Sequence, residues 1–214
     1  MLNLVCGCLG IINLWKGNPE HTAYYVWVAG IFDFFDGFVA RILKVTSPIG
    51  KDLDSLADMV SFGLLPSLFM YRMMEAAGAS PALCYVALFV AVCSALRLAV
   101  FNNDATQTDS FRGVPTPANT FFLTGLPFLR PIVPGVMENP MVLAAIAVIF
   151  SLLLVSRFEL FALKFKSFGW ADNKLRYSFL LLAVILLAIL QLTALPLIII
   201  LYIGLSLGSK VFSR

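Results

Sequence analysis

Apolar residues fill most positions of this chain and run in stretches of about 20, separated by short polar or proline-containing connections. Such stretches are typical of membrane-crossing helices, because about 20 residues rising 1.5 Å each span the hydrocarbon layer. We therefore predict an all-α fold, a polytopic transmembrane helical bundle with about eight spans. Their approximate ranges are 1–16, 22–43, 54–75, 80–101, 116–134, 139–158, 174–192 and 195–211.

Two of these stretches are irregular. Pro127 and Pro131 interrupt the fifth, which predicts a kinked or partly re-entrant segment. Only the corner at 194–196 separates the last two, so their connection must be very tight. Without an internal repeat or a low-complexity segment, residues 1–214 are expected to form a single membrane domain. Because the first apolar run starts at Met1 itself, we expect further native residues before it.

The composition supports a membrane protein and excludes other classes. Charged residues make up 13% of the chain and hydrophobic residues 60%, whereas soluble domains carry about 25% charged residues. The net charge is +3 without a basic run, so no nucleic-acid partner is expected. Cys6, Cys8, Cys84 and Cys93 lie in apolar runs and are predicted to be buried free thiols. The single histidine, His21, lies in a polar connection, which disfavours a zinc site.

Basic residues are distributed unequally between the two sides of the predicted bundle, and cytoplasmic connections are normally the basic ones. The side that carries both termini holds twelve: Arg41, Lys44, Lys51, Arg97, Arg112, Arg157, Lys164, Lys166, Lys174, Arg176, Lys210 and Arg214. The other side holds three: Lys16, Arg72 and Arg130. We therefore expect the segment from Asp33 to Asp58 to face the cytoplasm, in a protein of the cell membrane.

That segment, DFFDGFVARILKVTSPIGKDLDSLAD, contains five aspartates and three basic residues between apolar runs. In the second predicted span, one helical face carries Asp33, Asp36, Gly37, Ala40 and Arg41, at positions i, i+3, i+4, i+7 and i+8. A similar face on the next span carries Gly50, Asp54, Asp58 and Ser61. Because a short connection joins the two helices, their acidic faces are predicted to meet near the membrane surface.

Four carboxylates facing one another need compensation, because each charge costs about 2.5–3.5 kcal/mol in a membrane helix. Oxygen ligands without histidine or cysteine favour hard divalent cations, and four carboxylates can bridge two ions. Alternatively, the aspartates cap helices or pair with Arg41, Lys44 and Lys51, which suits Asp52 because it lies off the shared face. Gly37 leaves room either for a bulky ligand or for close helix packing.

The spacing of this segment carries a known resemblance. It reads Asp33-x2-Asp36-Gly37-x2-Ala40-Arg41-x8-Gly50-x3-Asp54-x3-Asp58 and resembles the complete signature of the CDP-alcohol phosphatidyltransferases. The resemblance implies an integral membrane enzyme that moves a phosphatidyl group from a CDP-linked lipid to an alcohol and releases CMP. It also implies a homodimer, two metal ions (Mg²⁺ or Mn²⁺, with Ca²⁺ as a substitute) on the four aspartates of the signature, and Asp58 as general base.

The same resemblance implies a binding surface for the CDP-linked lipid, made by Asp33, Gly37, Ala40, Arg41, Ser47 and Gly50. Arg41 can pair with a phosphate, and Ser47 matches a family position that contacts the nucleotide. The family usually has further residues before the LNL that opens this chain, including an asparagine near the nucleotide at the start of the first helix. Nucleotide contacts from that portion are therefore not assigned.

Motifs later in the chain restrict the choice of acceptor alcohol. The segments LRLAVFNND, FRGVPTPANTFF and KFKSFGW resemble those of bacterial and archaeal CDP-diacylglycerol–serine phosphatidyltransferases, which implies CDP-diacylglycerol and L-serine as substrates. Serine needs a cation for its carboxylate and oxygen acceptors for its ammonium group. Candidate residues are Arg97, Asn102, Asn103, Arg112 and Thr116. Alternatively, the arginines anchor the cytoplasmic side and the asparagines cap a helix.

Two competing functions remain open at this point. A related transferase would use another alcohol, namely glycerol phosphate, inositol phosphate or choline, and a phosphorylated acceptor would need additional cations. A divalent-cation transporter would place polar residues along a path across the membrane. Here the carboxylates lie at one edge, and spans six to eight are nearly devoid of polar groups, which disfavours transport.

Overall fold

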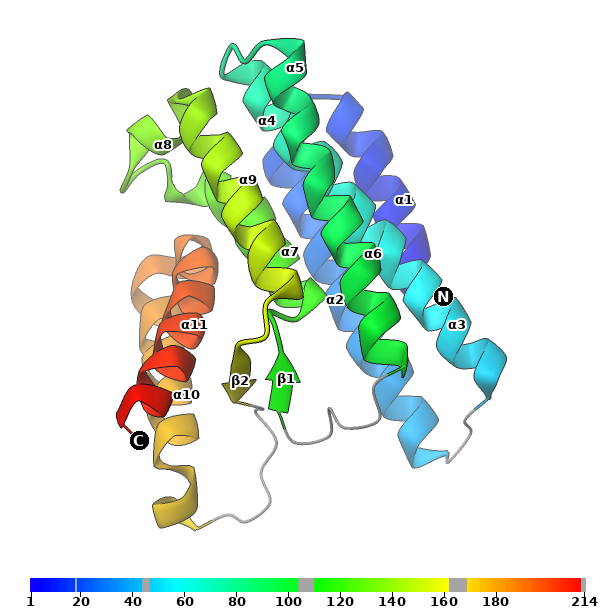
Figure 1. Ribbon diagram of the computed structural model, residues 1–214, viewed down its shortest axis with the longest axis vertical. Coiled ribbons are helices and arrows are strands. Elements are labelled where there is room, and N and C mark those ends of the chain that lie inside the picture. The colour runs from blue at the N-terminus through cyan, green and yellow to red at the C-terminus, as the bar shows by residue number, and fades with distance from the viewer. Residues whose placement is uncertain (18, 44–46, 104–109, 162–168, 213–214) are drawn as a thin grey trace.

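The computed structural model describes residues 1–17, 19–43, 47–103, 110–161 and 169–212. Within these ranges the fold is a bundle of helices with one small antiparallel sheet at one end (Figure 1). The α-helices are α1 Leu2–Trp15, α2 Pro19–Ile42, α3 Pro48–Asp58, α4 Leu65–Ala76, α5 Pro81–Cys84, α6 Leu88–Asn103, α7 Thr116–Gly125, α8 Pro134–Glu138, α9 Pro140–Val155, α10 Trp170–Leu190 and α11 Ala194–Phe212. A π-helix, η1, occupies Met59–Leu64, and short 3₁₀ helices lie at Tyr85–Ala87, Leu126–Leu129 and Gln191–Thr193.

The prediction of a wholly α-helical fold missed the sheet. Strand β1 (Ser110–Arg112) pairs with β2 (Glu159–Phe161), so that Arg112 lies opposite Glu159. These strands link the connection before α7 to the connection after α9. Three residues are too few for an alternating pattern to be recognised, which is why hydrophobic periodicity did not reveal them.

The predicted count of about eight spans is wrong. Of the described residues, four helical stretches are long and apolar enough to cross a membrane: Pro19–Ala40, Ile49–Ala76, Pro81–Asn103 and Asn173–Gly208. The apolar helices Leu2–Trp15 and Pro140–Val155 are shorter, and α7 ends at Gly125, just before Pro127. The last stretch contains both α10 and α11, which turn at Gln191 (φ 51°) and pack against each other. This turn lies just before the predicted corner at 194–196.

Helices α3, η1 and α4 follow one another without a break and place η1 among α1, α2, α6 and α7. Helix α1 approaches η1 closely at Gly7, where a Cβ atom would lie 2.3 Å from the Ser61 hydroxyl oxygen. Cys6, Val26, Phe62 and Leu65 form a buried cluster at this junction. The start of α1 is thereby held directly over the end of α3, where two of the signature aspartates lie.

A larger apolar cluster joins α4, α6, α7 and α9, with the rings of Phe122 and Phe150 stacked 3.8 Å apart. The cysteines are free thiols, as predicted, and three of them are buried. Cys8 is exposed, so its predicted burial is wrong. It lies two positions from the buried Cys6, and residues two apart on a helix face different directions.

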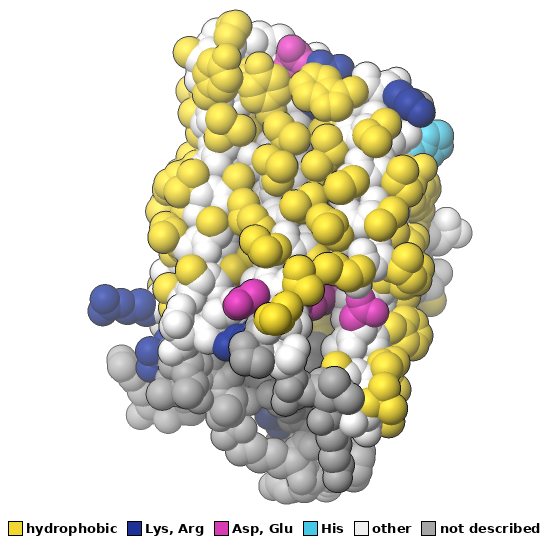
Figure 2. All heavy atoms as spheres, turned by 90° about the vertical axis from the view of Figure 1, so that its right-hand side faces the viewer, with side chains coloured by type: hydrophobic (Ala, Val, Ile, Leu, Met, Phe, Trp, Pro, Cys, Tyr) yellow, Lys and Arg dark blue, Asp and Glu magenta, His cyan; other side chains and the backbone are white. Residues whose placement is uncertain are grey.

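The outer surface of the bundle is apolar. Figure 2 shows hydrophobic side chains over the middle of one face, acidic and basic side chains near one end, and further charged side chains at the opposite end. Only 17% of the most apolar window in Pro19–Ala40 is buried inside the molecule. A helix that is apolar on its exposed side suits a lipid environment, so the fold is that of an integral membrane helical protein.

Candidate active site

Three of the predicted carboxylates come together where α2 and α3 meet. Asp33 from α2 and Asp54 and Asp58 from α3 each offer one oxygen, and these oxygens all lie within 4.8 Å of one another. Asp54 and Asp58 are four residues apart and therefore share one face of α3. The prediction that the two acidic faces meet is confirmed for these three residues.

Asp36, the fourth predicted carboxylate, lies beside this cluster. Its Oδ2 atom accepts a hydrogen bond from the amino group of Met1 at 2.6 Å, and nearly half of its side chain is exposed. It nevertheless lines the same pocket, which has a volume of about 770 Å³. The residues that line this pocket are Met1, Asn3, Asp36, Gly37, Ala40, Ser47, Gly50, Lys51, Leu53, Asp54 and Ala57.

The surroundings of the three carboxylates suit a divalent cation. Over the part of the chain that the structure describes, no lysine or arginine forms an ion pair with Asp33, Asp54 or Asp58. Lys51 instead donates to the backbone carbonyl of Asn102, so the alternative in which it neutralises the cluster is wrong. Lys44 and the side chain of Arg41 lie outside the described residues. Three oxygen ligands without nitrogen or sulfur favour a hard cation, so the cluster can hold a metal.

Asn3 is a site residue that the sequence analysis missed. Its Nδ2 atom donates to Asp58 Oδ1 at 2.9 Å, and its backbone carbonyl accepts from the Ser61 hydroxyl at 3.0 Å. The side chain is 2% exposed. The family resemblance implied an asparagine before the LNL segment, whereas the asparagine within that segment reaches the site. Its signal was a polar amide at the start of a mostly apolar helix, whose other amide, Asn13, donates to the Thr22 hydroxyl near the opposite end of that helix.

A π-helix begins directly after Asp58. Such helices leave backbone carbonyls out of the regular pattern and often occur at functional sites. In η1, the Phe62 carbonyl accepts from the Thr120 hydroxyl of α7 at 2.7 Å, and both residues are fully buried. This bond ties α7 to the helix that carries Asp54 and Asp58. No sequence pattern indicated the π-helix.

Gly37 opens one wall of the pocket. A Cβ atom added at Gly37 would meet nothing within 4 Å, so the alternative in which this glycine permits close helix packing is wrong. Ala40, one turn further along α2, lines the same pocket. The small residues of this face therefore leave space beside the carboxylates, as a bulky ligand would require.

We expect Gly37→Ala to raise the KM for a CDP-linked lipid while leaving the thermal midpoint of unfolding nearly unchanged. The added methyl group enters the space beside the carboxylates without touching the protein. Gly204→Ala, which also meets nothing within 4 Å and lies on α11 away from the pocket, is the matched control and should leave KM unchanged. A large loss of stability in Gly37→Ala with an unchanged KM would contradict this role.

The other predicted lipid-binding positions lie at the start of α3. The Ser47 hydroxyl caps that helix by accepting from the Gly50 amide at 3.0 Å, and both residues line the pocket. A Cβ atom at Gly50 would lie 3.0 Å from the same hydroxyl oxygen, which explains the glycine locally. Ser47 therefore has a structural role in addition to the predicted contact with the nucleotide.

The predicted serine-binding residues do not all lie in the same environment. Arg97 is 5% exposed and lies over the Phe101 ring at 5.4 Å, so it is not a surface anchor. Asn102 connects α6 to α3 by donating to the Ser55 hydroxyl at 2.6 Å. Asn103 donates to the Ala99 carbonyl of its own helix at 2.9 Å, which confirms the capping alternative for this residue.

The remaining candidates flank the start of α7. Arg112 is exposed in strand β1, and Thr116 is buried at the first position of α7. Asn119, which the sequence analysis did not select, is fully buried on the same helix. Neither atom of its side-chain amide has a hydrogen-bond partner among the residues described. A buried, unsatisfied amide is costly, by about 1–3 kcal/mol per group, and indicates a place where a polar ligand can bind.

Known proteins resemble this chain over most of its length. A family model described as CDP-alcohol phosphatidyltransferase matches residues 1–208. The CDP-diacylglycerol–serine O-phosphatidyltransferase of Bacillus subtilis is 34% identical over 158 residues, which cover 73% of this chain and 84% of that protein. The enzyme of the same name from Methanocaldococcus jannaschii is 31% identical over 156 residues, which cover 73% of this chain and 68% of that protein.

A third relative with that name, from Mycobacterium tuberculosis, is 36% identical over 137 residues. The match covers 61% of this chain and 47% of that protein, so it spans about half the length of the mycobacterial relative. The family match covers the aspartate cluster, the open face at Gly37 and the helices that hold them. The chain therefore belongs to the CDP-alcohol phosphatidyltransferase family.

Proposed function

We propose that this protein transfers the phosphatidyl group of CDP-diacylglycerol to the hydroxyl group of L-serine, giving phosphatidylserine and CMP. The observation that carries the proposal is the convergence of Asp33, Asp54 and Asp58 within 4.8 Å, beside a wall opened by Gly37, in a chain of this family. The choice of serine is supported by relatives from bacteria and an archaeon that carry the name of the serine-specific enzyme.

The carboxylates suit two divalent ions, Mg²⁺ or Mn²⁺, with Ca²⁺ as a substitute, on Asp33, Asp36, Asp54 and Asp58. Asp36 lines the same pocket as Asp54 and would join the other three carboxylates as the fourth ligand. Bound there, divalent ions would neutralise the pyrophosphate and stabilise the departing CMP. The carboxylates fix where the ions would bind, because Asp54 and Asp58 come from one face of α3.

Asp58 is the proposed general base. Asn3 holds its Oδ1 atom at 2.9 Å and thereby fixes the orientation of the carboxylate. In the proposed step, the serine hydroxyl gives its proton to Asp58 while its oxygen bonds to the phosphorus that carries diacylglycerol. The bond from that phosphorus to the bridging oxygen breaks, and the electron pair leaves with CMP.

The pocket of about 770 Å³ suits the CDP portion of the lipid substrate. Gly37, Ala40, Ser47 and Gly50 line it, and Arg41 follows on the same helix face, where it can pair with a phosphate. Two exposed phenylalanines of α2, Phe34 and Phe38, stack 6.1 Å apart on the outside of that helix. The acyl chains can therefore leave sideways into the bilayer.

For serine we propose a site that includes Arg97, Thr116 and the newly identified Asn119, with Asn102, Asn103 and Arg112 at its edge. Arg97, Thr116 and Asn119 are buried polar groups in an apolar bundle, and the Asn119 amide has no hydrogen-bond partner among the described residues, which is expensive unless a ligand supplies one. A zwitterion offers both donors and acceptors to such groups. The contact of α7 with η1 through Thr120 keeps this helix beside the segment that follows Asp58.

We expect Arg97→Lys and Arg112→Ala to raise the KM for serine by roughly 10–150-fold, the equivalent of the 1.5–3 kcal/mol of a charge-assisted hydrogen bond. The KM for CDP-diacylglycerol should change much less. The lysine retains a cation at the buried position 97, so that folding is preserved. Arg157→Ala, an exposed arginine next to β2, is the control. A rise confined to the KM for the nucleotide-lipid would assign these arginines to the phosphate site.

The decisive experiment is an acceptor screen. Purified protein is supplied with CDP-diacylglycerol, Mn²⁺ or Mg²⁺ and one alcohol at a time, and CMP release is measured together with the lipid product. We expect release with L-serine and none with glycerol 3-phosphate, inositol phosphate or choline. Release with a phosphorylated polyol and none with serine would overturn the serine assignment while leaving the family assignment in place.

We further propose that the protein lies in the cell membrane, that its active site faces the cytoplasm and that it forms a homodimer. In the structure Lys51 lines the pocket of the aspartates, whereas Arg72 and Arg130 lie together at the opposite end, and the sequence places basic residues on both sides of the aspartate segment; this bias supports the orientation. Labelling of single cysteines introduced at exposed Lys51 and Lys16 would test it. A membrane-impermeant reagent should reach position 16 from outside the cell and position 51 only after lysis.

A further inference from the structure

A second cavity lies at the end of the bundle opposite the aspartates. Its lining comes from the end of α1, the start of α2, the end of α4 and the segment between α7 and α9, all of which lie at this end of the bundle (Figure 1). Its volume is about 420 Å³, within the range of small-molecule sites. The residues that line it are Leu14, Gly17, Pro19, Glu20, Arg72, Met73, Ala76, Ala77, Pro127, Arg130, Met137 and Glu138.

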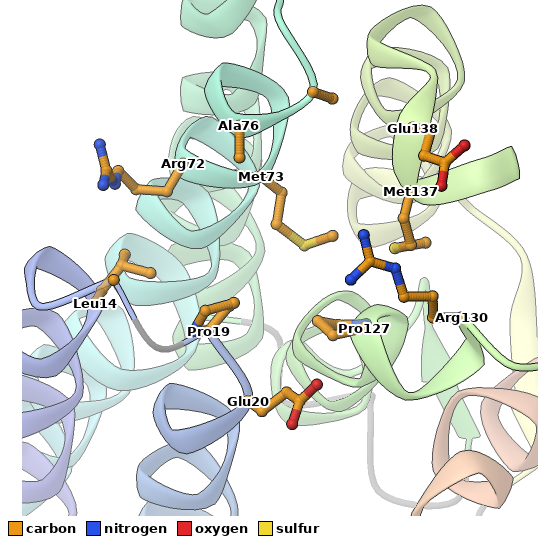
Figure 3. Close-up of a pocket in the computed structure, with 12 residues that line it drawn as sticks. Leu14, Pro19, Glu20, Arg72, Met73, Ala76, Pro127, Arg130, Met137 and Glu138 are labelled. Carbon is orange, nitrogen blue, oxygen red and sulfur yellow. The ribbon is translucent and has the colours of Figure 1, made fainter. Parts of the chain in front are cut away.

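The side chains in this cavity divide into apolar walls and separate charges. Figure 3 shows the Arg130 guanidinium between Met73 and Met137, with the Glu20 carboxylate directed toward the same side of the cavity. Among the residues that the structure describes, neither the Arg130 nor the Glu20 side chain forms a hydrogen bond or an ion pair. Opposite charges thus line one cavity without neutralising each other.

The neighbouring arginine is engaged elsewhere. Arg72 forms an ion pair with Glu75 and lies over the Trp15 ring at 5.3 Å. Figure 3 shows its guanidinium directed away from Met73. An arginine at a membrane face can simply extend to water. Arg130 is also exposed, but it lies between Met73 and Met137 in a cavity that holds the carboxylates of Glu20 and Glu138, so its surroundings suit a ligand.

We propose that this cavity binds the headgroup of a zwitterionic, amine-bearing phospholipid. The phosphate contacts Arg130, the ammonium group contacts Glu20, and the glycerol backbone and the start of the acyl chains lie on Leu14, Met73 and Met137. Among the described residues, the lining offers one cation without an ion pair, Arg130, for the phosphate, and two carboxylates, Glu20 and Glu138, at which the ammonium group can bind. The location at the end of the apolar helices matches the depth of lipid headgroups. The proposal is independent of the proposed function.

Native mass spectrometry of the full chain in detergent tests this site. The ligands are dihexanoyl phosphatidylethanolamine, dihexanoyl phosphatidylglycerol and inorganic phosphate. Arg130→Gln should weaken binding of both lipids about tenfold or more, as expected for a lost charge-assisted hydrogen bond. Glu20→Gln should weaken only the amine-bearing lipid. Lys16→Gln removes an exposed cation near the same end, outside the cavity lining, and should leave binding unchanged.

Three results would overturn the proposal. Equal lipid affinities in Arg130→Gln, Lys16→Gln and the unaltered protein would show that the lipid does not bind in this cavity. Loss of lipid binding in Asp54→Asn but not in Arg130→Gln would place the headgroup in the acidic pocket instead. Binding of inorganic phosphate as tightly as of the lipids, with the same dependence on Arg130, would indicate an anion site without lipid recognition. Because Arg130 and Glu20 are exposed, these variants should fold normally.

Discussion

Asp54→Asn is expected to lower CMP release from CDP-diacylglycerol and serine by more than about a hundredfold. Asp54 supplies one of three carboxylate oxygens within 4.8 Å, and asparagine keeps its volume while removing its charge. Changing a residue that merely supports a metal ligand already costs roughly 10–100-fold in metal affinity or activity, so loss of a direct ligand should cost more. Initial rates at increasing Mn²⁺ concentration measure the effect.

Asp52→Asn is the matched control, because Asp52 lies two residues away on the same helix, is exposed and is outside the cluster. It should retain the activity of the unaltered protein. Asp33→Asn should resemble Asp54→Asn, and Asp36→Asn reports whether that carboxylate joins the cluster when a cation binds. EDTA should abolish activity, and Mn²⁺ or Mg²⁺ should restore it. Full activity in EDTA, or in each of the variants Asp33→Asn, Asp36→Asn and Asp54→Asn, would refute the metal assignment.

Asp58→Asn is expected to separate substrate binding from chemistry. The variant should still bind CDP-diacylglycerol, whereas turnover should fall by about 10²–10⁴-fold, the usual cost of losing a general base. The structure supports this role because Asn3 donates to one carboxylate oxygen at 2.9 Å and thereby fixes its direction. Binding of a labelled CDP-diacylglycerol analogue and single-turnover CMP release would be measured on the same preparation.

Asn3→Ala is the companion variant for Asp58. Because Asn3 acts through Asp58, its loss should lower kcat by a smaller factor than Asp58→Asn and leave the KM for the lipid substrate nearly unchanged. The double variant should be no worse than Asp58→Asn alone, since the two residues act as a unit. If Asp58→Asn fails to bind the nucleotide-lipid while its thermal midpoint is normal, Asp58 is mainly a ligand and the assignment as base is wrong.

The sequence by itself determined the membrane character and the central part of the site. Twenty-residue apolar runs indicate spanning helices because helix rise and bilayer thickness are fixed. The intervals of three and four between aspartates placed them on shared helix faces because the helical period is fixed. A short connection keeps the two helices side by side, so their acidic faces can come into contact. These inferences needed only local geometry, and the structure confirms them for Asp33, Asp54 and Asp58.

Tertiary structure alone decided the remaining features of the site. Asn3 bonds Asp58 across 55 positions of sequence, because Gly7 lets α1 lie against η1. The open space at Gly37 and the unsatisfied burial of Asn119 likewise depend on which helices lie nearby. The number of spans also differed, since α7 ends before the prolines, α1 and α9 are short, and α10 and α11 belong to one apolar stretch. Packing between distant apolar faces decides all of these, and in a chain that is 60% hydrophobic nearly every face could pack against another.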